Sequence, residues 1–165
     1  LGDVYKRQIV MGFNQGMQPI AGYNFGARLF DRLIQVLKYT IFCGVTVTTI
    51  GFLAGQIFPQ SLICLLTSDE TLTNIAVEGL RIVLIFFPVV GFQMVTSSFF
   101  QSIGMAKKAI FLSLTRQLLF LIPSLLVFPS IWGTVGVWMS MPVADGIATI
   151  VAACMLRWQL KRLKA

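Results

Sequence analysis

The sequence predicts an all-α fold, a polytopic membrane helix bundle with about five transmembrane helices, on two observations. First, 56% of the 165 residues are hydrophobic, 12% are charged and the mean hydropathy is +0.83, whereas soluble domains average about half apolar and a quarter charged residues. Second, several stretches approach the roughly 20 apolar residues with which a helix crosses about 30 Å of hydrocarbon. The expected spans are residues 9–27, 38–58, 79–103, 109–128 and 132–156.

The first eight residues, LGDVYKRQ, stand apart from these spans. They contain no initiator Met and lack the basic, apolar and small-residue regions of a signal peptide. Codons for residues 3–8 can match a transposon mosaic end of the kind used in sequencing libraries. We therefore expect residues 1–8 to be a cloning or sequencing-adapter scar, with native sequence from about Ile9; the alternative is a genuine loop.

Basic residues indicate how the chain is oriented in the membrane. The net charge is +7, and beyond residue 8 the Lys and Arg side chains fall mostly in three clusters. The clusters are Arg28, Arg32 and Lys38; Lys107 and Lys108; and Arg157, Lys161, Arg162 and Lys164. Because an even number of crossings separates them, all three lie on one side, which the positive-inside rule makes cytoplasmic. The sequence thus predicts a multi-pass protein with a cytoplasmic C-terminus, whose basic tail meets membrane lipid rather than nucleic acid.

The composition argues against catalysis. The chain has no His, and its six Asp and Glu residues form no cluster. A transition-metal centre or a hydrolase site would have neither ligands nor a base. We therefore expect no enzyme, no cofactor and no metal site.

The segment GFNQGMQPIAGYNFGA, residues 12–27, places polar side chains among glycines. In a helix, the 100° step per residue brings Asn14, Gln15 and Gln18 onto one face. In hydrocarbon this face must line a watered cavity or another helix, where the amides would only bond between helices. Pro19 lacks a backbone donor and is expected to bend the helix. Two small-xxx-small pairs predict close helix packing: Gly12 with Gly16, and Gly22 with Gly26.

Two ionisable residues fall inside the expected spans. Arg116 is about 12 Å of helix rise from Lys108, and Asp145 is about 18 Å from Arg157, a difference that a long Arg side chain can bridge. Intramembrane charges are costly and usually mark a substrate or ion pathway. The alternatives are a structural ion pair, or an Arg116 side chain that reaches the inner headgroups. The sequence leaves open whether the two side chains touch.

Three stretches carry a family resemblance. QPIAGYNFGA, residues 18–27, resembles the end of the second helix of a half in the multidrug and toxic compound extrusion (MATE) family. Residues 99–129, which include "SIGMAKKA" and "TRQ", and residues 136–149, GVWMSMPVADGIAT, resemble later parts of the same half. The similarity is strongest to the bacterial branch of DNA-damage-inducible and drug-export proteins, and it covers essentially residues 9–165.

The resemblance implies a twelve-helix, two-lobed transporter in which residues 9–165 form a truncated C-terminal lobe. Such a fragment would belong to a cation-coupled antiporter of the inner membrane that exchanges protons or sodium ions for drug-like, amphipathic or cationic compounds. Its partner would be the missing N-terminal half, whose first helix carries the coupling carboxylate in this branch. The resemblance places the following residues of this chain in the substrate or ion pathway, beside Asn14 and Gln15: Gln18, Pro19, Asn24, Arg116, Gln117 and Asp145.

Two other functions stay open on the sequence. A lipid-linked oligosaccharide flippase of the same superfamily would have more charged residues in its cavity. A non-transporting membrane scaffold would use all of its polar residues in contacts between helices.

Overall fold

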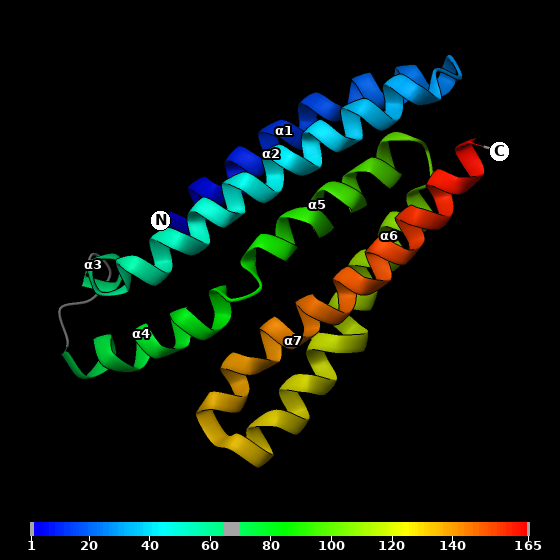
Figure 1. The fold of residues 1–165 in the computed structure, drawn as a ribbon. Helices are drawn as coiled ribbons and strands as arrows, with labels where there is room; N and C mark the ends of the chain where they lie inside the picture. The colour runs from blue at the N-terminus through cyan, green and yellow to red at the C-terminus, as the bar shows by residue number, and fades with distance from the viewer. Residues whose placement is uncertain (1, 65–69, 165) are drawn as a thin grey trace.

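The computed structural model describes residues 2–64 and 70–164 of the chain (Figure 1). Within this part every regular element is a helix, which confirms the predicted all-α fold. The helices are α1 (Gly2–Gly26), α2 (Phe30–Ile57), α3 (Pro59–Cys64), α4 (Glu70–Leu84), α5 (Phe87–Ser102), α6 (Ala106–Leu114), η1 (Thr115–Leu121) and α7 (Ile122–Lys164).

α1 passes without interruption through the segment of glycines and amides that opens the chain. Residues 12–26 are helical, with Pro19 inside the helix. The interpretation of this segment as a helix rather than a loop is therefore correct. The origin of residues 1–8 stays a prediction, because Leu1 and the side chains of that segment lie outside the described residues.

α2 begins well before the expected span 38–58. It starts at Phe30, so the basic stretch that leads into this span belongs to the same helix. Leu33, Ile34 and Leu37 are buried, which shows that the early turns already pack against the bundle. The span is thus the later part of a longer helix.

The expected span 79–103 is divided into α4 and α5, which meet at a bend of 49°. Pro88 lies in the first turn of α5 and explains the break. Its ring has no N–H and excludes an α-helical carbonyl four residues earlier, and this position is Leu84, where α4 ends. The helix also begins earlier than expected, at Glu70 rather than at residue 79.

The last apolar stretch, Ala106–Leu163, has 58 residues, about 87 Å of helix rise, far more than the thickness of a bilayer. Figure 1 shows that this stretch folds back on itself within α7. Gly133 has φ 57° and ψ −134° there, a conformation that glycine adopts without the strain of a Cβ. The two arms contact each other, since the Ser140 hydroxyl donates to the carbonyl of Ser124 over 3.0 Å. They correspond to the expected spans 109–128 and 132–156.

Length and apolarity support a multi-pass membrane protein. In the described residues two helices are long and apolar enough to cross a membrane, Phe30–Ile57 and Ala106–Leu163, and the bent pair of α4 and α5 adds a third. α1 is not among them. If α1, α2, the bent pair of α4 and α5, and each arm of Ala106–Leu163 count as one crossing, the order agrees with five spans. The number of spans stays a prediction.

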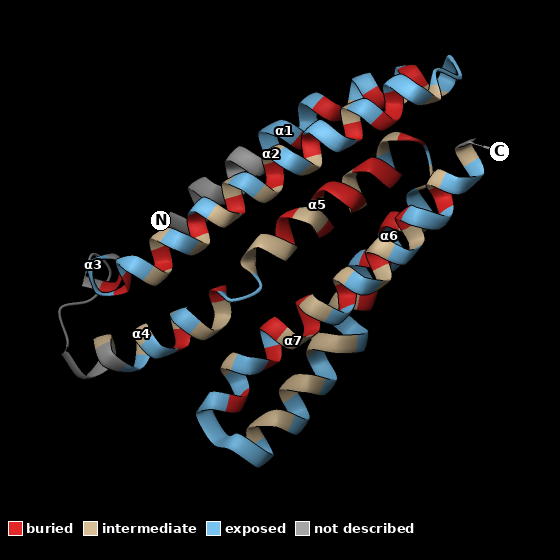
Figure 2. Ribbon diagram, in the orientation of Figure 1, coloured by how far each residue is buried: buried red, intermediate tan, exposed pale blue. Residues whose placement is uncertain are grey.

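α5 forms the centre of the bundle (Figure 2). Val95, Phe99 and Phe100 on α5 are completely buried and belong to a cluster that also includes Leu33 of α2 and Leu112 of α6. Large apolar side chains on the outer surfaces of the helices are exposed instead, among them Tyr39, Phe42, Ile50 and Leu126. A surface of this kind suits contact with hydrocarbon rather than water.

The three basic clusters meet at one end of the bundle. The α1–α2 turn, the α5–α6 turn and the C-terminus all lie at the right-hand end of Figure 1. The second and third clusters approach the same ring there: the ammonium of Lys108 lies 4.7 Å from the ring centre of Trp158, and the guanidinium of Arg162 lies 4.0 Å from it. The prediction that the clusters share one side is therefore confirmed as an arrangement in space.

Candidate functional site

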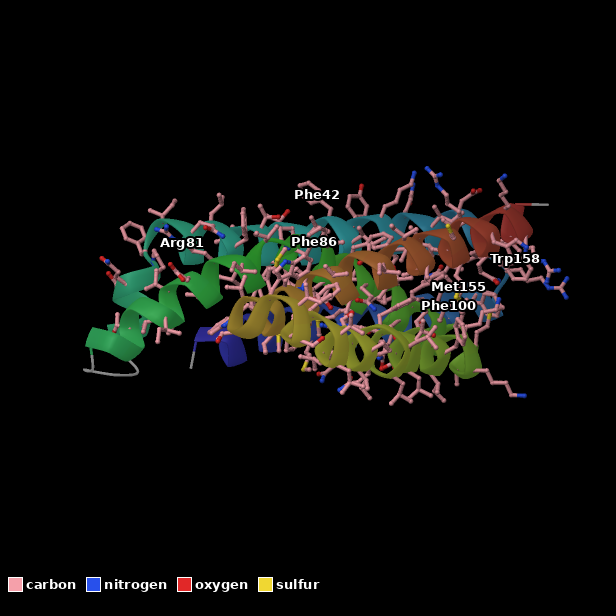
Figure 3. All side chains as sticks on the ribbon, turned by 90° about the horizontal axis from the view of Figure 1, so that it is seen from below. Phe42, Arg81, Phe86, Phe100, Met155 and Trp158 are labelled. Carbon is pink, nitrogen blue, oxygen red and sulfur yellow. The ribbon has the colours of Figure 1, made fainter. Side chains whose placement is uncertain are left out.

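A cavity of about 460 Å³ lies between α1, α5 and the α6–η1 segment, and we call it the amide cavity. α1 contributes Asn14, Gln15 and Gln18 to its wall. The facing polar side chains come from α5 and the α6–η1 segment: Gln93, Ser97, Ser98, Gln101, Ser113 and Arg116. In Figure 3, α1 and α6 run along one face of the bundle, while α2 and the last arm of α7 run along the other. The cavity therefore belongs to the face opposite α2.

Two residues that line this cavity have an amide oxygen with no hydrogen-bond partner among the described residues. They are Oδ1 of Asn14 on α1 and Oε1 of Gln93 on α5, and both residues are only 5% exposed. A buried acceptor without a donor costs about 1–3 kcal/mol. Neighbouring atoms cover the two oxygens in this structure, and the cavity that their residues line is where a donor from water or a ligand can reach them after a rotation of the side chain.

Arg116 and Asp145 form an ion pair across the two arms. The Nε–H of Arg116 donates to Oδ1 of Asp145 over 2.6 Å, and the two side chains are 36% and 11% exposed. The sequence left this contact open, and the structure shows it.

The ion pair lies between two cavities. Arg116 lines the amide cavity and also a second cavity of about 300 Å³, whose wall includes Gln117 and Asp145. The remaining lining of the second cavity is apolar and comes from α4, α5, η1 and α7: Leu80, Val83, Leu84, Phe87, Val90, Leu121, Met141 and Ala144. Arg116 is thus a lining residue that the two cavities share.

Arg116 and Gln117 are carried by η1, a π-helix that the sequence did not predict. The N–H of Ile122 donates to the carbonyl of Gln117, five residues earlier. Pro123 follows directly, and its ring would clash with the carbonyl of Leu119 in a regular α-helix, which accounts for the wider turn. Such π-helical turns are rare and are frequent at functional sites.

The structure brings together six of the eight residues expected in the pathway. Gln117 and Asp145 line the second cavity, and Arg116 links it to the three amides of α1. Pro19 and Asn24 line neither cavity. The Asn24 amide donates to the carbonyl of Ile20 over 2.8 Å within α1, so in this structure it bonds inside its own helix.

The glycines of α1 differ in their surroundings. A Cβ added at Gly22 would lie 3.1 Å from the carbonyl oxygen of Ser102, which is the close approach that the small-xxx-small pattern predicts. At Gly12, Gly16 and Gly26 an added Cβ would meet no atom within 4 Å in the described part of the chain. A packing role for these three glycines stays a prediction for a partner outside this chain.

Sequence reasoning missed the α5 wall of the amide cavity. Gln93, Ser97 and Gln101 follow one another at four-residue steps in α5. This spacing places them on one helix face, so the pattern was available in the sequence. The described residues contain no group of three His, Cys, Asp or Glu side chains that could hold a metal ion.

The all-α membrane bundle and the polar cavity between its helices define a membrane transport protein, and comparisons identify its family. The MatE family model matches residues 8–126. The chain therefore belongs to the MATE family, whose members are transporters rather than enzymes.

Relatives and solved structures agree with this assignment. Multidrug export protein MepA of Staphylococcus aureus is 22% identical over 144 residues, which cover 87% of this chain and 32% of MepA. The structure of the MATE multidrug transporter DinF-BH, determined as a complex, superposes with a TM-score of 0.84 at 34% identity, over 90% of this chain and 33% of that one. An outward-facing MATE transporter of the MOP superfamily has the same fold, with a TM-score of 0.87 at 23% identity, over 94% of this chain and 35% of that one. The chain thus spans about a third of the length of these proteins.

Proposed function

We propose that this chain is part of the C-terminal lobe of a cation-coupled antiporter that exports drug-like, amphipathic or cationic compounds across the cytoplasmic membrane. The amide cavity carries this proposal, because its wall includes Asn14 and Gln93, whose buried amide oxygens have no partner among the described residues. A protonated amine or a hydroxyl of a bound compound, or a water molecule beside it, satisfies such acceptors. The C-terminus lies on the cytoplasmic side in this proposal.

The chemistry of the cavity wall suits a compound that is bound loosely and released. Amides and hydroxyls accept and donate hydrogen bonds in several directions, and the thioethers of Met11 and Met94 give the cavity adaptable apolar surface. Among the described residues, Arg116 is the single charged residue that lines the cavity, and Asp145 already neutralises it. The charge of a cationic compound is therefore balanced by the N-terminal half, with which this chain forms the complete pathway.

Neither alternative function accounts for the cavity as well. A flippase for lipid-linked oligosaccharides is expected to use several charged groups, whereas the described wall of the amide cavity has one. A scaffold would place its polar groups in contacts between helices, whereas Asn14 Oδ1 and Gln93 Oε1 make none. The similarity to DinF-BH, a multidrug transporter, supports the choice of an exporter.

Removal of the two amides separates a binding role from a structural one. In the assembled transporter we expect Asn14→Ala and Gln93→Ala each to lower the efflux of ethidium, a fluorescent cationic dye, about fivefold to tenfold, since one lost hydrogen bond is worth roughly 1 kcal/mol. The melting temperature is expected to stay level or rise, because each variant also removes a buried, unpaired acceptor. Efflux from cells that lack their own pumps and thermal unfolding of the purified protein measure the two effects.

Gln35→Ala is the matched control, because Gln35 is an exposed amide on α2 that lines neither cavity. It should change neither efflux nor melting temperature. Normal efflux with a lowered melting temperature in the Asn14 and Gln93 variants would show that these amides are structural. Imposed proton or sodium gradients in proteoliposomes then identify the coupling ion, and efflux that follows neither gradient would contradict ion coupling.

A further inference from the structure

A further cavity, separate from the two described above, lies on the face of the bundle opposite the amide cavity, between the early turns of α2 and the last turns of α7. It measures about 600 Å³. Its floor and sides include Ile34 and Leu160, and the exposed ring of Trp158 borders it. We call it the α2–α7 groove.

Three cations border the α2–α7 groove. Lys38 comes from α2, and Arg157 and Lys161 come from α7. All three are exposed, and no acidic residue in the described part of the chain lines the groove. The one ion pair found among the described residues joins Arg116 to Asp145, so no carboxylate neutralises these cations. They are available to a ligand with negative charge.

A neighbouring cluster holds the wall of the groove in place. The ammonium of Lys108 donates to Oε1 of Gln159 over 2.6 Å, and it lies 4.7 Å from the ring centre of Trp158. Arg162 lies 4.0 Å from the same ring centre. Lys108 and Arg162 therefore position Trp158, while the three groove cations keep their donors free. Figure 3 shows Trp158 at the end of the bundle where nitrogen-tipped side chains gather.

The groove combines two features that a single class of molecule matches. Its cations lie at the end where the three basic clusters meet, which is the expected headgroup level. Its apolar floor lies between α2 and α7, whose outer surfaces carry exposed apolar side chains. A negatively charged phosphate suits the cations, and an acyl chain suits the apolar floor. Trp158 has the amphipathic ring that is typical of the membrane interface.

We propose that the α2–α7 groove is a binding site for an anionic diacyl phospholipid, with the phosphate held by Lys38, Arg157 and Lys161 and an acyl chain lying against Ile34 and Leu160. The site is independent of the transport proposal, because it faces away from the amide cavity. A lipid in this groove contacts both α2 and α7.

Competition between two lipids tests this site on the purified chain. The chain in detergent is incubated with equal amounts of phosphatidylglycerol and phosphatidylcholine, and native mass spectrometry measures the lipid that it retains. We expect at least a tenfold preference for phosphatidylglycerol. The variant Lys38→Gln/Arg157→Gln/Lys161→Gln should lose this preference and approach parity. Each basic residue near an anionic surface contributes about 1 kcal/mol, or roughly fivefold, so three of them suffice for a preference of this size.

The matched control removes three cations from the same end of the bundle. Arg28, Arg32 and Lys107 are exposed and do not line the groove, so Arg28→Gln/Arg32→Gln/Lys107→Gln should keep the preference within twofold. Parity in the unmodified chain would overturn the proposal. An equal loss in both triple variants would also overturn it, because general surface charge would then explain the binding.

Cys154 gives an independent measurement that needs no substitution. Its thiol is exposed and lines the groove. Vesicles with phosphatidylglycerol should slow its alkylation several-fold relative to vesicles of phosphatidylcholine alone, as measured by peptide mass. Millimolar glycerol phosphate, which has the headgroup chemistry without acyl chains, should not slow it. Equal protection by glycerol phosphate would mean that the groove is a phosphate site rather than a phospholipid site.

Discussion

Neutralising one member of the Arg116–Asp145 pair is expected to cost more stability than neutralising both. Arg116→Gln removes the positive charge beside a carboxylate whose side chain is 11% exposed. Removal of one member of a buried ion pair costs about 3–5 kcal/mol. Asp145→Asn leaves a guanidinium that is 36% exposed and borders two cavities, so water can solvate it and the loss is smaller, about 1–2 kcal/mol after discounting for that exposure.

The double variant Arg116→Gln/Asp145→Asn should recover most of this loss. No charge is left without a partner, and two amides can hydrogen-bond in its place. Melting temperatures of the four proteins in one detergent complete the cycle, with Lys107→Gln as a control for the loss of an exposed charge. Losses that simply add in the double variant would mean that the two residues are not coupled.

The same four proteins also show whether the pair does more than hold the arms together. A double variant with normal stability and normal efflux would assign the pair a structural role. A double variant with normal stability and little efflux would place the pair in the transport pathway, between the two cavities that Arg116 borders. This distinction rests on the proposed function and requires the assembled transporter.

The sequence predicted the helices of this fold better than their ends and bends. Apolar runs of about 20 residues identify helices because every backbone group must be satisfied inside the bilayer. They do not show where two helices break, which is why residues 79–103 were expected as one span although α4 and α5 meet at 49°. Pro88 predicts a kink within this span, but a single proline does not show that the kink divides the span into two helices. The α2 helix likewise begins at Phe30 because Leu33 and Leu37 are buried by tertiary contacts.

The candidate site was predicted in part for a similar reason. Helical periodicity alone placed Asn14, Gln15 and Gln18 on one face, and the structure has all three in the amide cavity. Periodicity does not show which helix faces them, and so the α5 wall with Gln93 was missed. The contact between Arg116 and Asp145 depends on the reversal at Gly133, which the expected spans 109–128 and 132–156 implied, and on the π-helical turn, which hydropathy does not encode.

Replacing Gly91 by Ala is expected to destabilise the bundle, although Ala is the better helix former. A Cβ at Gly91 would lie 2.5 Å from Oγ1 of Thr48 and 2.8 Å from the carbonyl oxygen of Gly44. Thr48 is held in place, since its hydroxyl donates to the Gly44 carbonyl over 2.9 Å, and the Gly44 carbonyl moves only with α2 itself. Overpacking of this kind costs about 1–3 kcal/mol.

Gly16→Ala is the matched control on α1, because a Cβ there meets nothing within 4 Å in the described part of the chain. It should keep or raise the melting temperature, given that Ala favours a helix over Gly by about 1 kcal/mol. Equal or higher melting temperatures for both variants would contradict the close contact between α2 and α5.

Gly91 lies two residues before Gln93 on α5, so a shift of α5 away from α2 also moves that wall of the amide cavity. We therefore expect Gly91→Ala to weaken ethidium efflux even at temperatures where the protein stays folded. If efflux is lost only where the protein unfolds, the contact between α2 and α5 does not affect the amide cavity.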